Sequence, residues 1–515
     1  MARSARRSIM NTRRGNPVSG CSSGPSMAPC APITRDGCST LQRGRSWSGC
    51  SRRALQKTCG CSRDLYRKAI GRLQFWNSQP GRIGTALAVA LVSVGCAGPA
   101  PAPKPVPALP PAAPLVSDEE STEISIRFFA KKVKEDPANF LAYNKLAGLH
   151  LQRLRDTGNV AYLEKALEAA RSSLEIFPAE INPDGLGHLA SAEFDAHDFR
   201  KARDHALQWT RLRPDRSAPF GLLGDACLEL GEYADAEKAY REMERSSRDD
   251  AIGVNTRWAH WKELHGDLDG ALAHLQEAHA AALSLTAPPR ELTAWCRWQF
   301  GELTFLRGEY AAAEKHYRDA LTVYPNYYRA VASLGRTLAA LGRREEAIAQ
   351  YEKATKIFPD PGYVAALGDL YHLAGRQAEA DAQYGIVSQI SRLGKLNGQL
   401  YNRQVVQFLA DHDRDPAEAY QQAAEEYESR KDVYGAATLG WAALKAGRIP
   451  EARRAAAESL SLNTPDPRLL YQAGMIARAA GDTAEARRLL SQALKQSPAF
   501  DPLQAPLARK ALEAL

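Results

Sequence analysis

Apolar and polar residues alternate with a helical period along most of the chain, and the clearest example runs from Arg329 to Pro359. Apolar residues three and four positions apart form one stripe on a helix. The first half of the stretch carries such a stripe at Val331, Leu334, Leu338 and Leu341, and the second half carries one at Ala347, Ile348, Tyr351 and Ala354. Gly342 separates the two stripes and Pro359 ends the second, so the stretch is predicted to be a helical hairpin.

This hairpin recurs with a period near 34 residues from about Ala138 to the C-terminus, and ten units fit. A period of this length is typical of stacked helical repeats. Small residues mark the first helices at Ala147, Ala190, Gly224, Ala259, Gly301, Gly335, Gly368, Gly440 and Gly474. They mark the second helices at Ala166, Ala202, Ala236, Ala271, Ala313, Ala347, Ala380, Ala419, Ala452 and Ala486. A missing side chain lets two helix axes approach to about 8–10 Å, so we expect these residues where the helices cross.

Seven units also carry a glycine between their two helices, at Gly231, Gly266, Gly308, Gly342, Gly375, Gly447 and Gly481. This pattern resembles that of the tetratricopeptide repeat (TPR) family. Each unit of that family carries a small residue in the first helix, a glycine in the turn, and then Ala, an aromatic residue, Ala and Pro. The resemblance covers roughly residues 123–515, with Tyr240, Tyr317, Tyr351 and Tyr384 at the aromatic place. It implies an all-α fold, a right-handed TPR superhelical solenoid of about ten helical hairpins with a C-terminal capping helix. Gln407 occupies a small-residue place, so unit eight is expected to depart most from the pattern.

The formal net charge of +8 is unevenly distributed. Residues 1–80 hold 15 Lys and Arg against 2 Asp and Glu, whereas the remaining residues hold 52 against 57. The repeats therefore lack the basic excess expected of a nucleic-acid-binding protein. Six of the nine cysteines fall within the first 61 residues, without a Cys-x-x-Cys pair or a histidine that would favour zinc. We interpret residues 1–80 as a disordered basic segment, or as a mis-assigned start of translation.

Residues 81–96 have the features of an export signal: Arg82, the apolar run Thr85–Val94, and Cys96 after small residues. The run is too short for a membrane-spanning helix. Its end resembles the bacterial lipobox, although Ser93 stands where Leu is usual. The resemblance implies lipidation of Cys96, and Ala97 next to it favours an outer-membrane lipoprotein facing the periplasm. Residues 97–117 read as a Pro/Ala-rich linker, which leaves 118–515 for the TPR solenoid.

The sequence contains neither the His-Glu-x-x-His spacing of helical zinc sites nor a phosphate-binding loop. The one Gly-x-Ser-x-Gly match begins at Gly20, among residues that predict no strand before it or helix after it. His260 and His265, like His274 and His279, are five apart and do not share a helical face. No catalytic residue, metal site or cofactor is predicted.

One cluster of aromatic and charged residues is a candidate for binding a partner. In the TPR family the first helices line the concave surface, and the spacing places Trp295, Trp298, Glu302 and Phe305 there, with Arg329 and Arg336 from the next unit beside them. Aromatic residues with arginine are typical of binding hot spots. The other interpretation is that the aromatic side chains fill the core beside the long loop Leu283–Arg290.

The function expected from these features is a non-catalytic scaffold that binds proteins or peptides in its concave groove and is tethered to the cell envelope by a lipid. Two alternatives remain open. One is a soluble cytoplasmic TPR regulator, and the other is an enzyme with its site on the array itself.

Overall fold

The computed structural model describes residues 118–246, 250–396 and 403–515, all within one compact unit, Pro107–Leu515. The segments interpreted above as the basic stretch 1–80, the export signal 81–96 with Cys96, and the linker 97–117 lie outside the described residues. Everything that follows concerns the array.

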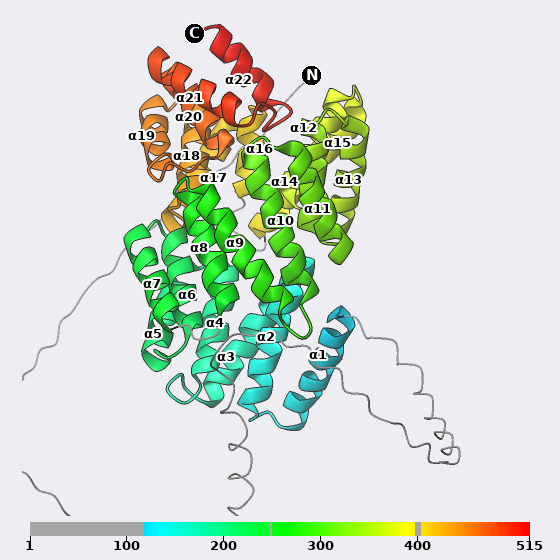
Figure 1. Ribbon diagram of the computed structural model, residues 1–515, viewed down its shortest axis with the longest axis vertical. Coiled ribbons are helices and arrows are strands. Elements are labelled where there is room, and N and C mark those ends of the chain that lie inside the picture. Colours follow the sequence, from blue (N-terminus) through cyan, green and yellow to red (C-terminus); the bar gives the residue numbers. More distant parts are fainter. Residues whose placement is uncertain (1–117, 247–249, 397–402) are drawn as a thin grey trace, which may run out of the picture. The chain divides into compact units, whose positions relative to one another are not determined.

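The described residues fold into ten helical hairpins with a single helix at each end, as the all-α TPR prediction requires (Figure 1). The first helices of units one to ten are α2 (Phe140–Thr157), α4 (Pro183–Asp195), α6 (Ser217–Glu229), α8 (Ala251–Leu264), α10 (Arg290–Leu306), α12 (Tyr328–Ala340), α14 (Pro361–Leu373), α16 (Arg403–Asp411), α18 (Val433–Lys445) and α20 (Pro467–Ala479). The second helices are α3 (Ala161–Ile176), α5 (Phe199–Leu212), α7 (Tyr233–Ser246), α9 (Leu268–Leu283), α11 (Tyr310–Val323), α13 (Arg344–Ile357), α15 (Gln377–Leu396), α17 (Pro416–Ser429), α19 (Ile449–Ser459) and α21 (Thr483–Gln496). The end helices are α1 (Asp118–Glu135) and α22 (Gln504–Glu513).

The turn between the two helices of each unit contains a residue with positive φ. All seven predicted glycines adopt this conformation, with φ between 73° and 83°. Gly158, His197 and Asp413 take the same place in units one, two and eight. Glycine adopts positive φ without steric cost, whereas a side chain opposes it. The turn geometry therefore extends to the three units that the glycine pattern missed.

The small residues lie where the two helices of a unit meet. All ten predicted second-helix alanines have an exposed fraction of 0%. On the first helices, a Cβ atom added at Gly224 or Gly301 would lie 2.3 Å from the ring of Tyr240 or Tyr317. Such a distance is far inside van der Waals contact, so a glycine is required at these places. Unit eight departs as expected, because Gln407 takes the place of a small residue on its first helix and is half-buried there.

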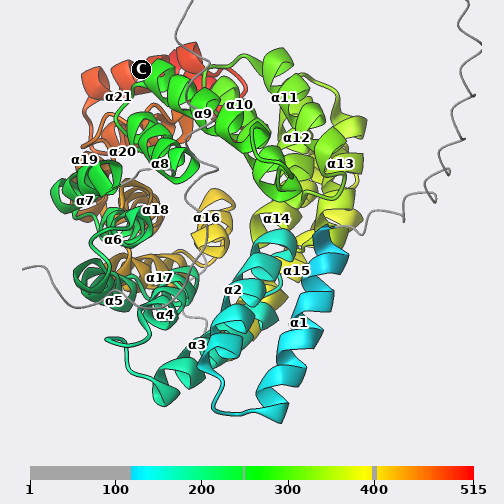
Figure 2. The same cartoon turned by 60° about the horizontal axis from the view of Figure 1, so that its bottom comes forward.

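Successive hairpins stack in chain order, since each second helix packs against the first helix of the next unit. First helices also pack on one another, as α4 does on α2 and α18 on α16. Figure 2 shows that the stack follows a curved path, with the first helices toward its inside and the second helices toward its outside. The first helices therefore supply the inner surface.

Units that are five apart along the chain also touch. The turns of units three, four and five lie against the loops that follow units eight, nine and ten, and the turn of unit one lies against the residue that follows α13. We call this set of contacts the seam. Its close approaches join Gly158 to Phe358, Gly231 to Lys431, Gly266 to Asn463 and Gly308 to Gln496.

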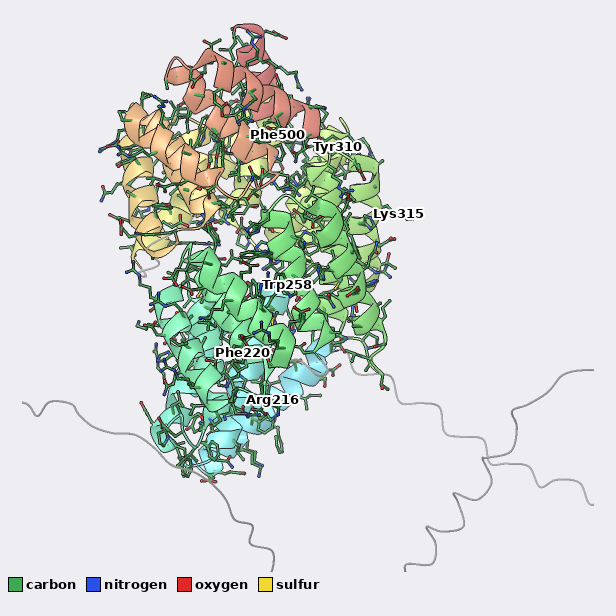
Figure 3. All side chains as sticks on the ribbon, turned by 60° about the vertical axis from the view of Figure 1, so that its left-hand side comes forward. Arg216, Phe220, Trp258, Tyr310, Lys315 and Phe500 are labelled. Carbon is green, nitrogen blue, oxygen red and sulfur yellow. The ribbon has the colours of Figure 1, made fainter. Side chains whose placement is uncertain are left out.

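Hydrogen bonds and an ion pair hold the seam together. Arg430 Nε lies 2.5 Å from Glu229 Oε2. The backbone N–H of Ala499 donates to the hydroxyl oxygen of Tyr310 at 2.8 Å, and Figure 3 shows Tyr310 close to Phe500 on the other side of this contact. Further hydrogen bonds join Tyr310 to Ser497, Thr464 to Leu264, Gln496 to Leu306 and Arg200 to Glu428. The seam thus links units one to five with segments that follow units six, eight, nine and ten or that end unit eight.

The two end helices differ in how they cover the array. α22 buries Ala505, Ala508 and Ala511 against the last hairpin. α1 buries no residue completely and leaves Ile124 and Phe128 45% and 54% exposed. None of the helices in the described ranges is long and apolar enough to cross a membrane.

A matched pair of glycine variants tests whether the seam contributes to stability. Gly231 and Gly447 are both turn glycines with φ of 73°, but only Gly231 faces another segment: its added Cβ would lie 2.5 Å from the Lys431 carbonyl oxygen, whereas Gly447 has nothing within 4 Å. We expect Gly447→Ala to cost about 1–2 kcal/mol through the positive φ alone. Gly231→Ala should cost about 1–3 kcal/mol more, because it also forces the seam apart. Urea unfolding of the full chain measures both; equal losses would show that the seam adds nothing.

Candidate functional site

Three units present the same arrangement of an acid, a tyrosine and a cation on the inner surface. In units three, five and seven a carboxylate follows the small residue of the first helix, and the tyrosine of the same hairpin donates a hydrogen bond to it. These pairs are Tyr240 with Asp225 at 2.8 Å, Tyr317 with Glu302 at 2.7 Å, and Tyr384 with Asp369 at 2.9 Å. A cation from the next first helix completes each group: Arg257 on Asp225, Arg336 on Glu302 and His412 on Asp369. The groups tie adjacent units together.

Unit six breaks this arrangement. Arg336 follows Gly335 at the place where units three, five and seven have a carboxylate, so Tyr351 lacks the acid to which the tyrosines of those units donate. Tyr351 is 7% exposed, and its hydroxyl makes no hydrogen bond to any described residue. Arg336 Nη2 lies 2.7 Å from Glu302 Oε2, but the buried Nε atom of Arg336 lacks a partner in the part of the chain that the structure describes. Unit six therefore leaves hydrogen-bonding capacity unused on both side chains.

The six residues predicted for the groove fall into two groups. Glu302, Phe305 and Arg336 form one contact set, in which the Arg336 guanidinium lies 4.0 Å from the centre of the Phe305 ring. Burial disfavours the charged form of Arg336, but the Glu302 carboxylate and nearby tyrosines more than offset this, so the pKa of Arg336 lies above its ordinary value. Phe305 itself is only 2% exposed.

The second group comprises Trp295, Trp298 and Arg329. Trp298 is half-buried; its Nε1 donates to Ser333 Oγ at 2.9 Å, and the Arg329 guanidinium lies 5.5 Å from its ring centre. Trp295 packs among apolar residues of units four to six, which favours the core-filling interpretation for this side chain. That these six residues contact a partner stays a prediction.

The inner surface of units five to ten contains a cavity of about 500 Å³. Its lining comes mainly from the first helices α10, α12, α14, α16, α18 and α20 and from the start of α22. Phe305 and Arg336 of the predicted groove residues line it, and so does Tyr351. Ligand sites commonly measure about 300–1,000 Å³, so this cavity has the size of a binding site.

Most charged groups around the cavity are paired. Arg468 joins two carboxylates, since its Nη1 lies 3.2 Å from Asp411 Oδ2 and its Nη2 lies 2.5 Å from Asp501 Oδ2. Asp411 also accepts a hydrogen bond from Trp441 Nε1 at 2.8 Å. Burial raises the pKa of Asp411 above its usual value, although Arg468 opposes that shift. A second arginine, Arg403, pairs with Glu426 and Asp432 behind the cavity wall.

No group of three or more metal-ligating side chains occurs among the described residues. Cys227 and Cys296 are free and buried, and burial raises the pKa of each thiol to about 12. Such thiols remain protonated at neutral pH and are poor nucleophiles.

Sequence reasoning missed most of the cavity. Asp411, Arg468 and Asp501 are separated from one another by 30 residues or more, and no local spacing joins them. A detectable signal did exist for the three acid–tyrosine pairs, because the carboxylate directly follows the small residue and the tyrosine lies 15 positions later. The sequence also shows that unit six lacks this carboxylate, because Arg336 directly follows Gly335.

Comparisons with known proteins agree with this architecture. Sequence models described as tetratricopeptide repeat match residues 189–251, 250–326, 305–370 and 437–501. Together with the ten hairpins, they assign the chain to the tetratricopeptide-repeat superfamily. A comparison with curated proteins found no match.

Solved structures with a similar fold include three proteins of low sequence identity. PilW, a widely conserved type IV pilus biogenesis factor, is 15% identical over 40% of this chain and 91% of its own, with a TM-score of 0.34. Human IFIT1, a dimer with m7Gppp-AAAA, is 16% identical over 67% and 78%, with a TM-score of 0.43. The Cut9-Hcn1 hetero-tetramer of APC/C contains a chain 14% identical over 77% and 96%, with a TM-score of 0.29. At these identities the likeness concerns the fold alone.

The unequal tyrosines give a direct prediction for stability. Tyr317→Phe removes a hydrogen bond to a carboxylate and should cost about 1.5–3 kcal/mol. Tyr351→Phe removes a hydroxyl that bonds to no described residue, so it should change the free energy of unfolding by less than about 0.5 kcal/mol. The chemical change is the same in both variants, so each controls the other in a urea titration. A large loss for Tyr351→Phe would mean that its hydroxyl has a structural partner.

Proposed function

We propose that the protein is a non-catalytic scaffold that binds a segment of another protein on the inner surface of its TPR array. The observation that carries this proposal is the cavity of about 500 Å³ on that surface, lined by first helices of six successive units. A bound segment would contact several units at once, as extended repeat surfaces allow.

The side chains around the cavity support a binding role. Hot spots favour aromatic residues and arginine that are partly withdrawn from water. Phe305, Tyr363 and Phe500 line the cavity together with Arg336 and Arg468. The ion pairs hold these arginines in place before a partner arrives, which lowers the entropy lost on binding.

We further propose that a lipid on Cys96 tethers the array to the cell envelope. The support is the order of features in the sequence: Arg82, the apolar run Thr85–Val94, Cys96 and a Pro/Ala-rich linker directly before the repeats. A linker of this composition is extended and semi-rigid, and it would hold the array away from the membrane surface.

Photo-crosslinking tests the binding surface. The benzophenone amino acid p-benzoylphenylalanine is placed either at Tyr363, which lines the cavity, or at Lys315, which is exposed on α11 on the outside of the array (Figure 3). In the cells that produce the full chain, irradiation should give protein adducts from position 363 and none from position 315. Adducts from Lys315 alone would place the binding surface on the outer helices.

Metabolic labelling with palmitate tests the tether. The full chain should take up label, and Cys96→Ser should abolish it, because the thiol at this position is the predicted acceptor. Intact-mass spectrometry of the mature protein then reports its first residue. An unlabelled chain in which Cys96 is still internal would contradict the lipoprotein proposal.

A further inference from the structure

The charges that line the cavity do not balance. Five aspartates and three arginines belong to its described lining. Each of these arginines already pairs with one or two carboxylates, and His412 pairs with Asp369. Arg468 accounts for Asp411 and Asp501. The other two carboxylates in the lining, those of Asp360 and Asp466, form no ion pair with a described residue.

Asp360 and Asp466 are the N-cap residues of α14 and α20. Asp360 Oδ1 accepts the N–H of Gly362 at 2.8 Å, and Asp466 Oδ1 accepts the N–H of Arg468 at 2.7 Å. Within the described ranges neither carboxylate takes part in an ion pair, and both side chains are half-buried. Burial raises the pKa of both carboxyl groups, although backbone N–H groups and nearby arginines oppose the shift.

A second, independent feature of the cavity points to a ligand. The Tyr351 side chain is 93% buried, lines the cavity and has a hydroxyl without a partner among the described residues. The hydroxyls of its counterparts Tyr240, Tyr317 and Tyr384 are all satisfied by carboxylates. Arg336 lies next to Tyr351 in the lining, and its Nε atom has no partner among the described residues. Together they offer hydrogen bonds to an oxygen atom that the array itself does not supply.

Aromatic rings complete the lining near the two spare carboxylates. Tyr363 follows Asp360 by three residues, and Tyr434 and Phe500 also face the cavity. The face of an aromatic ring attracts a cation, by about 0.5–2 kcal/mol depending on its exposure to water. A cavity lined by both carboxylates and aromatic rings can bind an ammonium or guanidinium group.

We propose that the cavity binds an extended peptide segment that carries lysine or arginine. The cationic side chain lies beside Asp360 and Asp466, and a main-chain carbonyl of the segment accepts hydrogen bonds from Tyr351 and Arg336. This inference rests on the proposed function and adds the chemistry of the partner.

Fluorescence anisotropy of the full chain with three rhodamine-labelled peptides tests the proposal. The peptides are Ala-Lys-Ala-Lys-Ala-Lys-Ala and the versions with Gln or Glu in place of Lys. The lysine peptide should bind at least about ten-fold more tightly than the glutamine peptide, and the glutamate peptide most weakly. The preference should diminish as salt is added, since screening weakens attraction between charges. Equal affinity for the lysine and glutamine peptides would overturn the proposal.

Matched variants assign the two halves of the site. The double change Asp360→Asn and Asp466→Asn keeps good N-caps but removes both charges, so the thermal midpoint should hold while the lysine peptide binds about ten-fold more weakly. Asp482→Asn, a cap outside the cavity, is the control and should leave binding unchanged. Tyr351→Phe should weaken binding of the lysine and glutamine peptides alike, because the hydrogen bond to the main chain is common to both. Unchanged binding in the Asp360/Asp466 double variant would refute the cationic site.

The experiments distinguish failure of this inference from failure of the scaffold proposal. If the peptides show no charge preference but position 363 still crosslinks to a protein, this inference is wrong and the scaffold function stands. If neither is seen, both are wrong.

Discussion

The array depends on one steric constraint, the close approach of the two helices of a unit. In units three, five, six and seven this approach sets a glycine on the first helix against a tyrosine ring on the second. At Gly301 and Gly368 a single added carbon atom would lie within 2.5 Å of the ring of Tyr317 or Tyr384. Because the helices approach this closely, the tyrosine hydroxyl reaches past the glycine to the inner surface of the array. There it meets the carboxylate that follows the glycine in sequence. Close packing and polar organisation of the inner surface thus have the same cause.

The polar groups of that surface connect residues within a unit and also join neighbouring units. Glu302 illustrates the point, because it accepts hydrogen bonds from Tyr317 of its own hairpin and from Ser333 of the next, and it also pairs with Arg336. Removing one partner of such a network leaves a half-buried charge without compensation, which costs more than the bond itself was worth. Arg468 plays a similar part nearer the C-terminus by joining Asp411 to Asp501. The inner surface is therefore organised before any ligand binds.

Much of the fold could be predicted from the sequence because its determinants are local. Alanine at the helix crossings, glycine at the turns and proline after the second helix recur within each unit of about 34 residues, and the structure confirms all seven predicted turn glycines. The seam could not be predicted in this way. The contact of Gly231 with Lys431 depends on the summed rotation of five hairpins, and small errors in each would place the two segments far apart.

The candidate site was predictable only in part, for the same reason. Phe305 and Arg336 belong to adjacent units, so their proximity followed from the period, and both line the cavity. Trp295 has the same aromatic character but points into the core, a distinction that depends on its place around the helix relative to two neighbours. Asp360 and Asp466 come from units seven and ten and line the same cavity because the stack is curved.

Repeat proteins commonly change length by gaining or losing units, since each unit contacts only its neighbours. The seam removes that freedom here. Duplicating one hairpin between units three and eight would shift the loop at Lys431 away from Gly231 and would part Glu229 from Arg430. Natural variants of this array should therefore differ by extension at its ends or by growth of single loops, while the number of hairpins between paired segments stays constant.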